Sequence, residues 1–309
     1  MRKVFLSTPL KQQAIDLMSA AGLKVDVNTG DRPQGEELLE IIKNYDVIQI
    51  GVRQKLTPDI VTQIETPKVI ATMSTGLDHI DKAFLRSPMF KIVNIKKANA
   101  ISVAEHIFAL ILALSKRVME SQALTLNNGN RNDLFERPVD ISNKIIGFVG
   151  AGNITQEAMR FATAFRMKIL CNTANPEKHA DIERQGIEFV PLDDLLQRSD
   201  IINVSIPLTK DTYWFISRDK IALIKPTATF INTSRAEVVD TKALIEYADT
   251  HSTFYAGLDI DADTEELAEL FKTPRRNVIV TPHTAGVSKE AIDRMDLEIA
   301  ESILLATKD

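Results

Sequence analysis

The sequence predicts an α/β protein of two units, each built around a parallel sheet. Strand-like and helix-like segments alternate from the first apolar run to the last helix, as they do where helices connect parallel strands. A length of 309 residues suits about two domains, taking roughly 100–200 residues for each. Two of the later apolar runs end in polar loops, and ligands of open parallel sheets bind beyond the carboxyl ends of the strands.

Five short apolar runs in the first hundred residues alternate with segments of helical spacing. Short runs bounded by turn residues indicate strands, whereas apolar residues three and four apart indicate helices. This alternation predicts one small flavodoxin-like unit. Its strands are expected at 4–6, 24–27, 47–50, 69–72 and 92–94, with helices at about 11–21, 35–44 and 58–64.

A long helix is expected over about 102–121, followed by a polar loop at 127–133 whose Asn, Gly and Asp residues favour turns. A second α/β unit, of Rossmann type, opens with an apolar strand and a glycine turn at 144–152 and continues to residue 280. The last helix, about 289–306, has apolar spacing suited to packing on the first unit. The second unit is therefore expected to be inserted into the first.

The composition argues against several classes of partner and site. A net charge of -5 disfavours nucleic acid, which needs a basic face. The most apolar stretch, 107–114, is far shorter than the ~18 residues of a membrane span, and the first residues do not resemble a secretory signal. Five scattered histidines and one cysteine give no metal-ligand spacing. Cys171 lies in an apolar strand, where a core role is expected, and a lone cysteine suits a reducing cytoplasm.

The segment Gly150-Ala151-Gly152-Asn153-Ile154-Thr155 follows an apolar strand and opens a helix. Its two glycines allow a tight turn and the close approach of backbone to a pyrophosphate. The helix start that follows supplies N–H groups and a favourable dipole for that charge. Thr155 stands where such loops usually have a third glycine, which predicts a small shift of the helix. The segment is expected to bind a dinucleotide.

The end of the next strand indicates which dinucleotide is bound. Sites of this type usually place Asp or Glu there, on the ribose hydroxyls of the adenosine. Here the position falls on Thr173, so no carboxylate repels a 2′-phosphate. Thr173, Asn175 and Lys178 are able to donate to such a phosphate. We therefore expect NADP(H), and the alternative that the loop binds NAD less tightly stays open.

Two strand-end loops each carry one residue suited to reducing a carbonyl. The apolar run ending at Ile231 leads into a polar loop with Arg235, and the run at 278–280 leads into a loop with His283. A guanidinium is permanently charged and donates two N–H groups to a carboxylate or keto oxygen. Histidine exchanges a proton near neutrality. Reduction of a 2-keto acid needs this pair; the plainer alternatives are a surface ion pair for Arg235 and a structural role for His283.

These loops also carry a resemblance. N-T-S-R-A-E-V-V-D at 232–240 and T-P-H-T-A-G at 281–286 resemble the arginine and histidine signatures of the D-isomer-specific 2-hydroxyacid dehydrogenase family. Segments at 74–81, 102–106 and 199–212 resemble, in the right order, the family's substrate-carboxylate loop, its long helix and the strand and loop under the adenosine. A-T-M-S-T-G-L-D-H-I-D, ending at Asp81, is most similar to the glyoxylate/hydroxypyruvate reductase branch.

The resemblance implies hydride transfer between a nicotinamide cofactor, NADP or NAD, and a small 2-keto or 2-hydroxy acid. It assigns 99–287 to the dinucleotide and 1–98 with 288–309 to the substrate, in a cytoplasmic homodimer. Arg235 is then the substrate clamp and His283 the acid/base. The backbone at Ser74, Thr75 and Gly76 would hold the substrate carboxylate, unless it is an ordinary polar turn. Cofactor contacts fall on Gly150, Gly152, Asn153, Ile154, Thr173, Pro207, Thr212, Thr233, Asp259 and Gly286.

One member of the family's constellation is displaced. The family pairs its histidine with a glutamate in the pattern L-D-V-F-x-x-E-P, which maps onto 258–265 and places Thr264 at the glutamate position. Glu265, one residue further, is expected to pair with His283 through a bulged loop. Asp261 and Asp263 are its competitors.

The departures from the family pattern leave a second hypothesis open. Thr155, Thr173, Ala236 and the displaced glutamate would also suit a dinucleotide-binding sensor or interaction protein of the same fold that has lost turnover. The presence of both Arg235 and His283 favours the enzyme.

Overall fold

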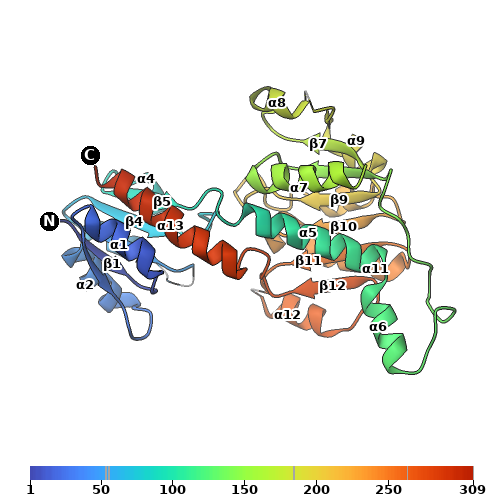
Figure 1. The fold of residues 1–309 in the computed structure, drawn as a ribbon, viewed down its shortest axis with the longest axis horizontal. Helices are drawn as coiled ribbons and strands as arrows, with labels where there is room; N and C mark the ends of the chain where they lie inside the picture. The colour runs from blue at the N-terminus through green and yellow to red at the C-terminus, as the bar shows by residue number, and fades with distance from the viewer. Residues whose placement is uncertain (53, 55, 184, 263, 309) are drawn as a thin grey trace. The chain divides into compact units, whose positions relative to one another are not determined.

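Two compact units make up the fold (Figure 1). The first comprises Met1–Asn99 with Lys289–Asp309, and the second comprises Ala100–Ser288. Each unit has its own parallel sheet, which confirms the predicted α/β class. The computed structural model describes residues 1–52, 54, 56–183, 185–262 and 264–308.

The first unit is a five-stranded parallel sheet covered by helices on both faces. Its elements are β1 (Lys3–Leu6), α1 (Gln12–Ala20), β2 (Lys24–Val27), α2 (Gly35–Asn44), β3 (Val47–Ile50), α3 (Pro58–Thr62), β4 (Lys68–Thr72), α4 (Lys82–Arg86), β5 (Phe90–Asn94) and α13 (Lys289–Ala306). The strand order, β2-β1-β3-β4-β5, is the flavodoxin-like one. One buried cluster joins α1 and α13 to the sheet through Met18 and Ile299. A second joins α2, α3 and α4 to the other face through Leu38 and Phe84.

The second unit is a seven-stranded parallel sheet. Its strands are β6 (Ile145–Val149), β7 (Lys168–Asn172), β8 (Glu188–Phe189), β9 (Ile201–Val204), β10 (Thr229–Asn232), β11 (Tyr255–Asp259) and β12 (Val278–Thr281). Their order is β12-β11-β10-β9-β6-β7-β8. Strand β6 therefore lies between β7 and β9, where the order of the strands reverses. Ligands of doubly wound sheets bind at such a point, beyond the carboxyl ends of the strands.

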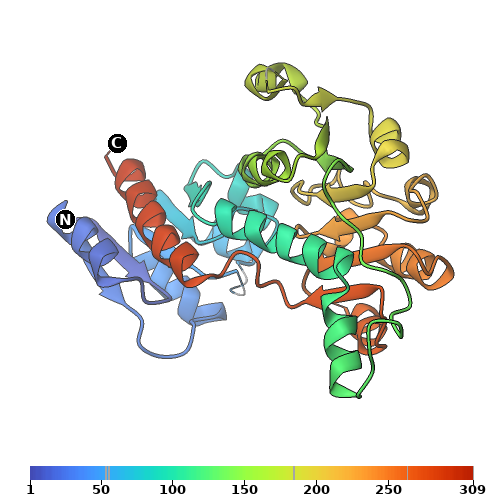
Figure 2. The ribbon, with the colours of Figure 1, turned by 45° about the vertical axis from the view of Figure 1, so that its right-hand side comes forward.

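Helices cover both faces of this second sheet. The helices of this unit are α5 (Ala100–Ser115), α6 (Val118–Leu126), α7 (Asn153–Ala164), η1 (Pro176–His179), α8 (Ala180–Glu183), α9 (Leu192–Arg198), α10 (Arg218–Ile221), η2 (Ala236–Val238), α11 (Thr241–Thr250) and α12 (Glu265–Lys272), of which α6 extends away from the sheet. Figures 1 and 2 show α5 and α7 together on one face, where Phe108 and Phe148 belong to one buried cluster. Helices α9, α10 and α11 pack in a second buried cluster on the opposite face of the sheet, which includes Phe230 and Leu244.

The long helix expected over 102–121 is in fact two helices, α5 and α6. The break falls at Arg117, whose φ of 55° lies in the left-handed region. Its guanidinium donates to Glu136 at 2.9 Å and lies 3.6 Å from the ring centre of Tyr255. These partners hold Arg117 inside the fold, and tertiary contacts of this kind override local helix propensity.

Cys171 on β7 is fully buried, as predicted for a core residue. Burial raises the pKa of its thiol to about 12, so the thiol stays protonated and unreactive at neutral pH. The helices of the described residues include none that is long and apolar enough to cross a membrane.

The carboxyl group of Asp296, on α13, is buried in the first unit, with 3% of the residue exposed. It accepts a hydrogen bond of 2.8 Å from the backbone N–H of Lys11, at the start of α1. Burial raises the pKa of this carboxyl, and the nearby Asp293 adds to the rise, although the bond and charge of Lys11 oppose it.

We predict that Asp296→Asn stabilises the protein at pH 7 and much less at pH 4. A carboxyl whose pKa is raised by folding favours the folded state below its unfolded pKa, and that advantage is lost as the pH rises through the folded pKa. The amide keeps an acceptor for Lys11 and carries no charge. Thermal unfolding at pH 7 should show a gain of about 2 °C or more, whereas Glu301→Gln, on an exposed part of the same helix, should change little. An equal gain at both pH values would contradict this account.

Candidate active site

The turn after β6 has a first position that only glycine fits. Gly150 has a φ of 105°, and a Cβ on it would lie 2.5 Å from the carbonyl oxygen of Ser205. A Cβ on Gly152 would meet no atom within 4 Å, so the space beside the start of α7 is open. The first turn of a helix has N–H groups without acceptors inside the helix. The geometry of this turn therefore fits a pyrophosphate.

Thr155, which stands in place of the third glycine, is fully buried. It lies on the buried face of α7 with Ala158 and Met159. Its hydroxyl has no hydrogen-bond partner among the residues that the structure describes. Helix α7 nevertheless begins at Asn153, directly after the glycine turn. The strand–turn–helix arrangement thus accommodates the threonine.

Residues assigned to the cofactor follow β7, β9 and β10. Thr173 comes directly after the last residue of β7. After β9, the Thr212 hydroxyl donates to the Pro207 carbonyl at 2.6 Å, which closes that loop. Thr233 follows β10, and its buried hydroxyl has no partner within the described part of the chain. The glycine turn and the open space at Gly152 follow β6, and this hydroxyl follows β10, on the other side of β9; together they fit a dinucleotide at one edge of the sheet.

Arg235 lies three residues beyond β10, in a turn that Asn232 shapes. The Asn232 side chain accepts hydrogen bonds from the backbone N–H and the hydroxyl of Ser234, at 2.9 and 2.7 Å. Its Nδ2 donates to the Arg235 carbonyl at 2.9 Å. The guanidinium is half-buried, and Nη1 donates to the Ser234 carbonyl at 2.9 Å. A buried amide thus fixes the loop that carries the cation.

His283 lies two residues beyond β12, in a loop held by the buried carboxylate of Asp259. The Asp259 oxygens accept from the backbone N–H groups of Thr284 and Ala285, both at 2.8 Å, and from the Thr281 hydroxyl at 2.6 Å. His283 itself has a φ of 53°, which is uncommon for a residue other than glycine. The bonds to Asp259 on either side hold this conformation.

Asp261, and not Glu265, is the carboxylate that the structure pairs with His283. Its Oδ2 forms a short hydrogen bond with His283 Nδ1. The register explains the pairing, because Asp259 lies beside Thr281 in the parallel pair of β11 and β12. Two residues beyond this pair on each segment, Asp261 lies beside His283.

The expectation for Glu265 is therefore corrected. Thr264 caps α12, its hydroxyl accepting from the backbone N–H of Leu267 at 3.2 Å, so Glu265 is drawn into the first turn of that helix. The third competitor, Asp263, lies outside the described residues. The pairing with Asp261 follows from the β11–β12 register, which the family motif does not specify.

His106 and the structural role of Asp259 were not predicted from the sequence. His106, on α5, places Nε2 3.1 Å from the Thr281 hydroxyl and 3.7 Å from Asp259 Oδ1. Asp259 was assigned to the cofactor, and in the structure both of its oxygens accept hydrogen bonds from the 281–285 loop. The signal in the sequence was a carboxylate as the last residue of a buried strand, with polar residues after the next apolar run.

The loop of Ser74, Thr75 and Gly76 follows β4 in the first unit. The Ser74 hydroxyl donates to the Gly76 carbonyl at 2.7 Å and lies 3.1 Å from the Thr72 hydroxyl. Thr72 also contacts Nε2 of His79 at 3.0 Å, which agrees with a structural role for that histidine. The loop is a polar turn held by these hydrogen bonds. Gly286 and the other residues assigned to the cofactor belong to the second unit.

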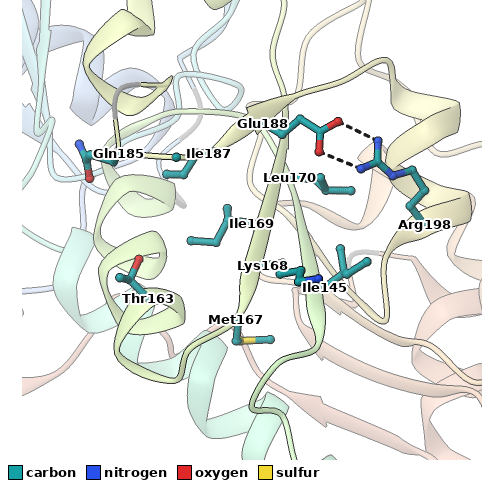
Figure 3. Close-up of a pocket in the computed structure, with 11 residues that line it drawn as sticks. Ile145, Thr163, Met167, Lys168, Ile169, Leu170, Gln185, Ile187, Glu188 and Arg198 are labelled. Atoms are coloured by element: carbon teal, nitrogen blue, oxygen red, sulfur yellow. Dashed lines mark hydrogen bonds and ion pairs between the residues drawn. The ribbon is translucent and has the colours of Figure 1, made fainter.

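A separate hollow lies at the other end of the second sheet (Figure 3). Ile145 and Lys168, the first residues of β6 and β7, line it, so it is at the amino ends of the strands and away from the glycine turn. The guanidinium of Arg198, which also lines the hollow, donates two hydrogen bonds to Glu188 at 2.9 and 2.8 Å. This hollow is not the dinucleotide site.

A dinucleotide turn, a cationic loop and a histidine–carboxylate pair at the ends of one parallel sheet define a nucleotide-dependent oxidoreductase. The model of the D-isomer specific 2-hydroxyacid dehydrogenase NAD binding domain matches residues 108–285. Hydroxypyruvate reductase of Thermotoga maritima is 32% identical over 306 residues, which span 97% of this chain and 97% of that protein. The chain belongs to the D-isomer specific 2-hydroxyacid dehydrogenase family.

Solved structures agree with this assignment. An acyclic imino acid reductase in complex with NADPH and D-Arg matches with a TM-score of 0.86 at 27% identity, over 99% of this chain and 98% of that one. A D-lactate dehydrogenase from Aquifex aeolicus, complexed with NAD and lactic acid, matches with a TM-score of 0.85 at 28% identity, over 99% and 95%. The second unit is thus an NAD-binding domain, and its structural relatives bind NAD or NADPH.

We predict that Asp259→Asn strongly destabilises the protein and that Asp261→Asn does not. Asp259 is fully buried, and an amide there presents donors to the N–H groups of the loop. Losing charge-assisted bonds at a buried site costs about 2 kcal/mol or more, which corresponds to a fall in Tm of roughly 5 °C. The side chain of Asp261 is 46% exposed, so its substitution should change Tm little. Equal losses in both variants, measured by thermal unfolding, would contradict the role given to Asp259.

Proposed function

We propose that the protein reduces small 2-keto acids to 2-hydroxy acids, with His283 as the proton donor and Arg235 as the substrate clamp. The main support is the His283–Asp261 pair at the same end of the sheet as the Arg235 loop. Strands β10 and β12 flank β11, so their ends lie roughly 10 Å apart, at two strand spacings. A small acid fits between loops at that separation.

The chemistry divides among the groups at the strand ends. A bound, reduced nicotinamide supplies the hydride for the keto carbon. Arg235 holds the keto oxygen and stabilises the negative charge that develops on it, the kind of electrostatic help that contributes most in such reactions. His283 donates the proton to that oxygen. Asp261, bonded to Nδ1, orients the ring and keeps a proton on Nδ1, so that Nε2 exchanges the proton with the substrate.

In this proposal the substrate is a short 2-keto acid of the glyoxylate or hydroxypyruvate type. The support is the sequence at 71–81 together with the relative named hydroxypyruvate reductase. Its carboxylate is assigned to the backbone N–H groups at Thr75 and Gly76. Thr173 after β7 supports NADPH as the preferred donor, because no carboxylate stands there to repel a 2′-phosphate.

We expect the purified protein to oxidise NADPH faster than NADH with glyoxylate or hydroxypyruvate. Initial rates with these acids, pyruvate and one branched 2-keto acid give the test. A preference for NADH would support the proposed reductase activity but refute the preference for NADPH that we infer from Thr173. Failure to turn over all four acids, in protein shown to bind a dinucleotide, would refute the enzyme and favour a sensor.

Variants separate the roles of the charged residues in the same assay. Arg235→Ala and Asp261→Asn should each lower kcat/KM by about 100-fold or more. Arg218→Ala, a matched change at an exposed arginine paired with Glu246, should leave kcat/KM nearly unchanged. Glu265→Gln should also have little effect, because that side chain begins α12. A large loss in Glu265→Gln with none in Asp261→Asn would restore the glutamate as the partner.

We also propose that the protein is a homodimer through α6 and the segment after it. Val118, Met119, Leu126, Phe135 and Val139 are between 47% and 73% exposed, and α6 has no buried residue in the described chain. Exposed apolar groups of this kind mark interaction surfaces. A cytoplasmic location, suited to one buried thiol, belongs to the same proposal.

Light scattering should therefore give twice the mass of one chain. Met119→Glu with Leu126→Glu should shift the mass to one chain, because two carboxylates cannot be buried in an apolar interface without partners. Exposed Lys242→Glu is a control of similar charge change on another surface. A single-chain mass for the unmodified protein would refute the dimer.

A further inference from the structure

We infer that Asn94 and Lys96 are positioning residues that hold the backbone N–H groups of the 74–77 loop outward, toward the carboxylate of the substrate. Asn94 is the last residue of β5, next to β4 in the first unit. The residue is 5% exposed and its side chain reaches the loop after β4. The inference rests on the proposed function, because it concerns how that substrate is held.

The Lys96 ammonium sets the orientation of the Asn94 amide. Lys96 Nζ lies 2.6 Å from Asn94 Oδ1. An ammonium is only a donor, so the atom that faces it must be the amide oxygen. The NH₂ end of the amide then faces the loop, where it donates to the Ser74 carbonyl at 3.2 Å and to the Thr75 carbonyl at 2.8 Å.

Planarity of the peptide bond carries this orientation to the other side of the loop. In a trans peptide the C=O and N–H point in opposite directions. Because the carbonyls of Ser74 and Thr75 point at Asn94, the N–H groups of Thr75 and Gly76 point away from it. The Gly76 carbonyl is likewise held by the Ser74 hydroxyl at 2.7 Å, which turns the N–H of Leu77 away from that hydroxyl.

These N–H groups have no acceptor in the part of the chain that the structure describes. The carbonyls of the same peptides are all bonded inward. Successive N–H groups presented on one side make a concavity that binds anions. The ammonium of Lys96 is separated from the loop only by the Asn94 side chain, and it adds positive potential there. A carboxylate is the group of a 2-keto acid that such a concavity takes.

The turn that carries Lys96 is itself anchored. The carboxylate of Glu298, on α13, accepts from the backbone N–H groups of Lys96, Lys97 and Ala98, with shortest distances of 2.5, 3.2 and 2.7 Å. These bonds fix the backbone from which Lys96 reaches Asn94. Lys97, adjacent and exposed, shares the anchor and has no bond to Asn94, so it is a matched control.

The test is steady-state kinetics with a 2-keto acid that the unmodified protein reduces, together with inhibition by oxamate. Lys96→Met should raise KM and the oxamate inhibition constant about three- to tenfold, with kcat within about twofold, since only binding of the carboxylate is weakened. Asn94→Asp, which replaces the donors with an oxygen facing two carbonyls, should raise both constants at least about thirtyfold. Lys97→Met should change neither, and Lys96→Arg should restore most of the loss.

The outcomes separate this inference from the proposed function. Unchanged KM and oxamate inhibition in Lys96→Met and Asn94→Asp, in an active enzyme, would overturn the inference alone. So would a loss of kcat and thermal stability with KM unchanged, which a purely structural role predicts. Absence of both turnover and oxamate binding in the unmodified protein would refute the proposed function first. If Asn94→Asp fails to fold, the exposed Lys96 and Lys97 variants still decide the question.

Discussion

The buried carboxylate of Asp259 accepts the hydrogen bonds on which the arrangement of the proposed catalytic groups depends. A charge taken out of water is unfavourable unless hydrogen bonds replace its hydration. Here the replacement comes from the Thr281 hydroxyl and from two successive backbone N–H groups of the loop after β12. The loop must therefore close onto the end of β11, and His283 takes its unusual backbone conformation as a consequence.

The same strand end supplies the partner of the histidine. Side chains separated by two residues lie on one side of an extended chain, so Asp261 follows Asp259 toward the neighbouring loop. Asp259 is buried and bonds backbone, whereas Asp261 is partly exposed and bonds the imidazole. Two carboxylates of one short segment thus have separate tasks, one structural and one directed at the acid/base. On the other side of β11, the Asn232 amide performs the structural task for the Arg235 loop without any charge.

The sequence predicted the features that depend on local pattern and failed where distant contacts decide. Alternating strands and helices, and Gly150, Arg235 and His283 after apolar runs, are local signals. The break at Arg117 was missed because it depends on Glu136 and Tyr255, which only the fold brings to it. Glu265 was preferred because it is a glutamate one residue beyond the motif position, although the capping of α12 by Thr264 draws it into a helix. The outward N–H groups after β4 depend on the rotation of peptide planes, which residue types do not specify.

The structure accommodates two of the departures from the family pattern that the sequence suggested could impair catalysis. The proposed acid/base role needs an acceptor at Nδ1 of the histidine, and any residue of the β11 loop that reaches Nδ1 with a carboxylate supplies one. A parallel register lets any position opposite His283 do so, and Asp261 occupies that position here. Thr155 is likewise accommodated inside α7 without displacing the start of that helix from the glycine turn. Asp261, three residues before the family's glutamate position, contacts His283 and so meets the need of the proposed acid/base for a partner. The relocated acid therefore favours a working acid/base over a sensor that only retains the fold.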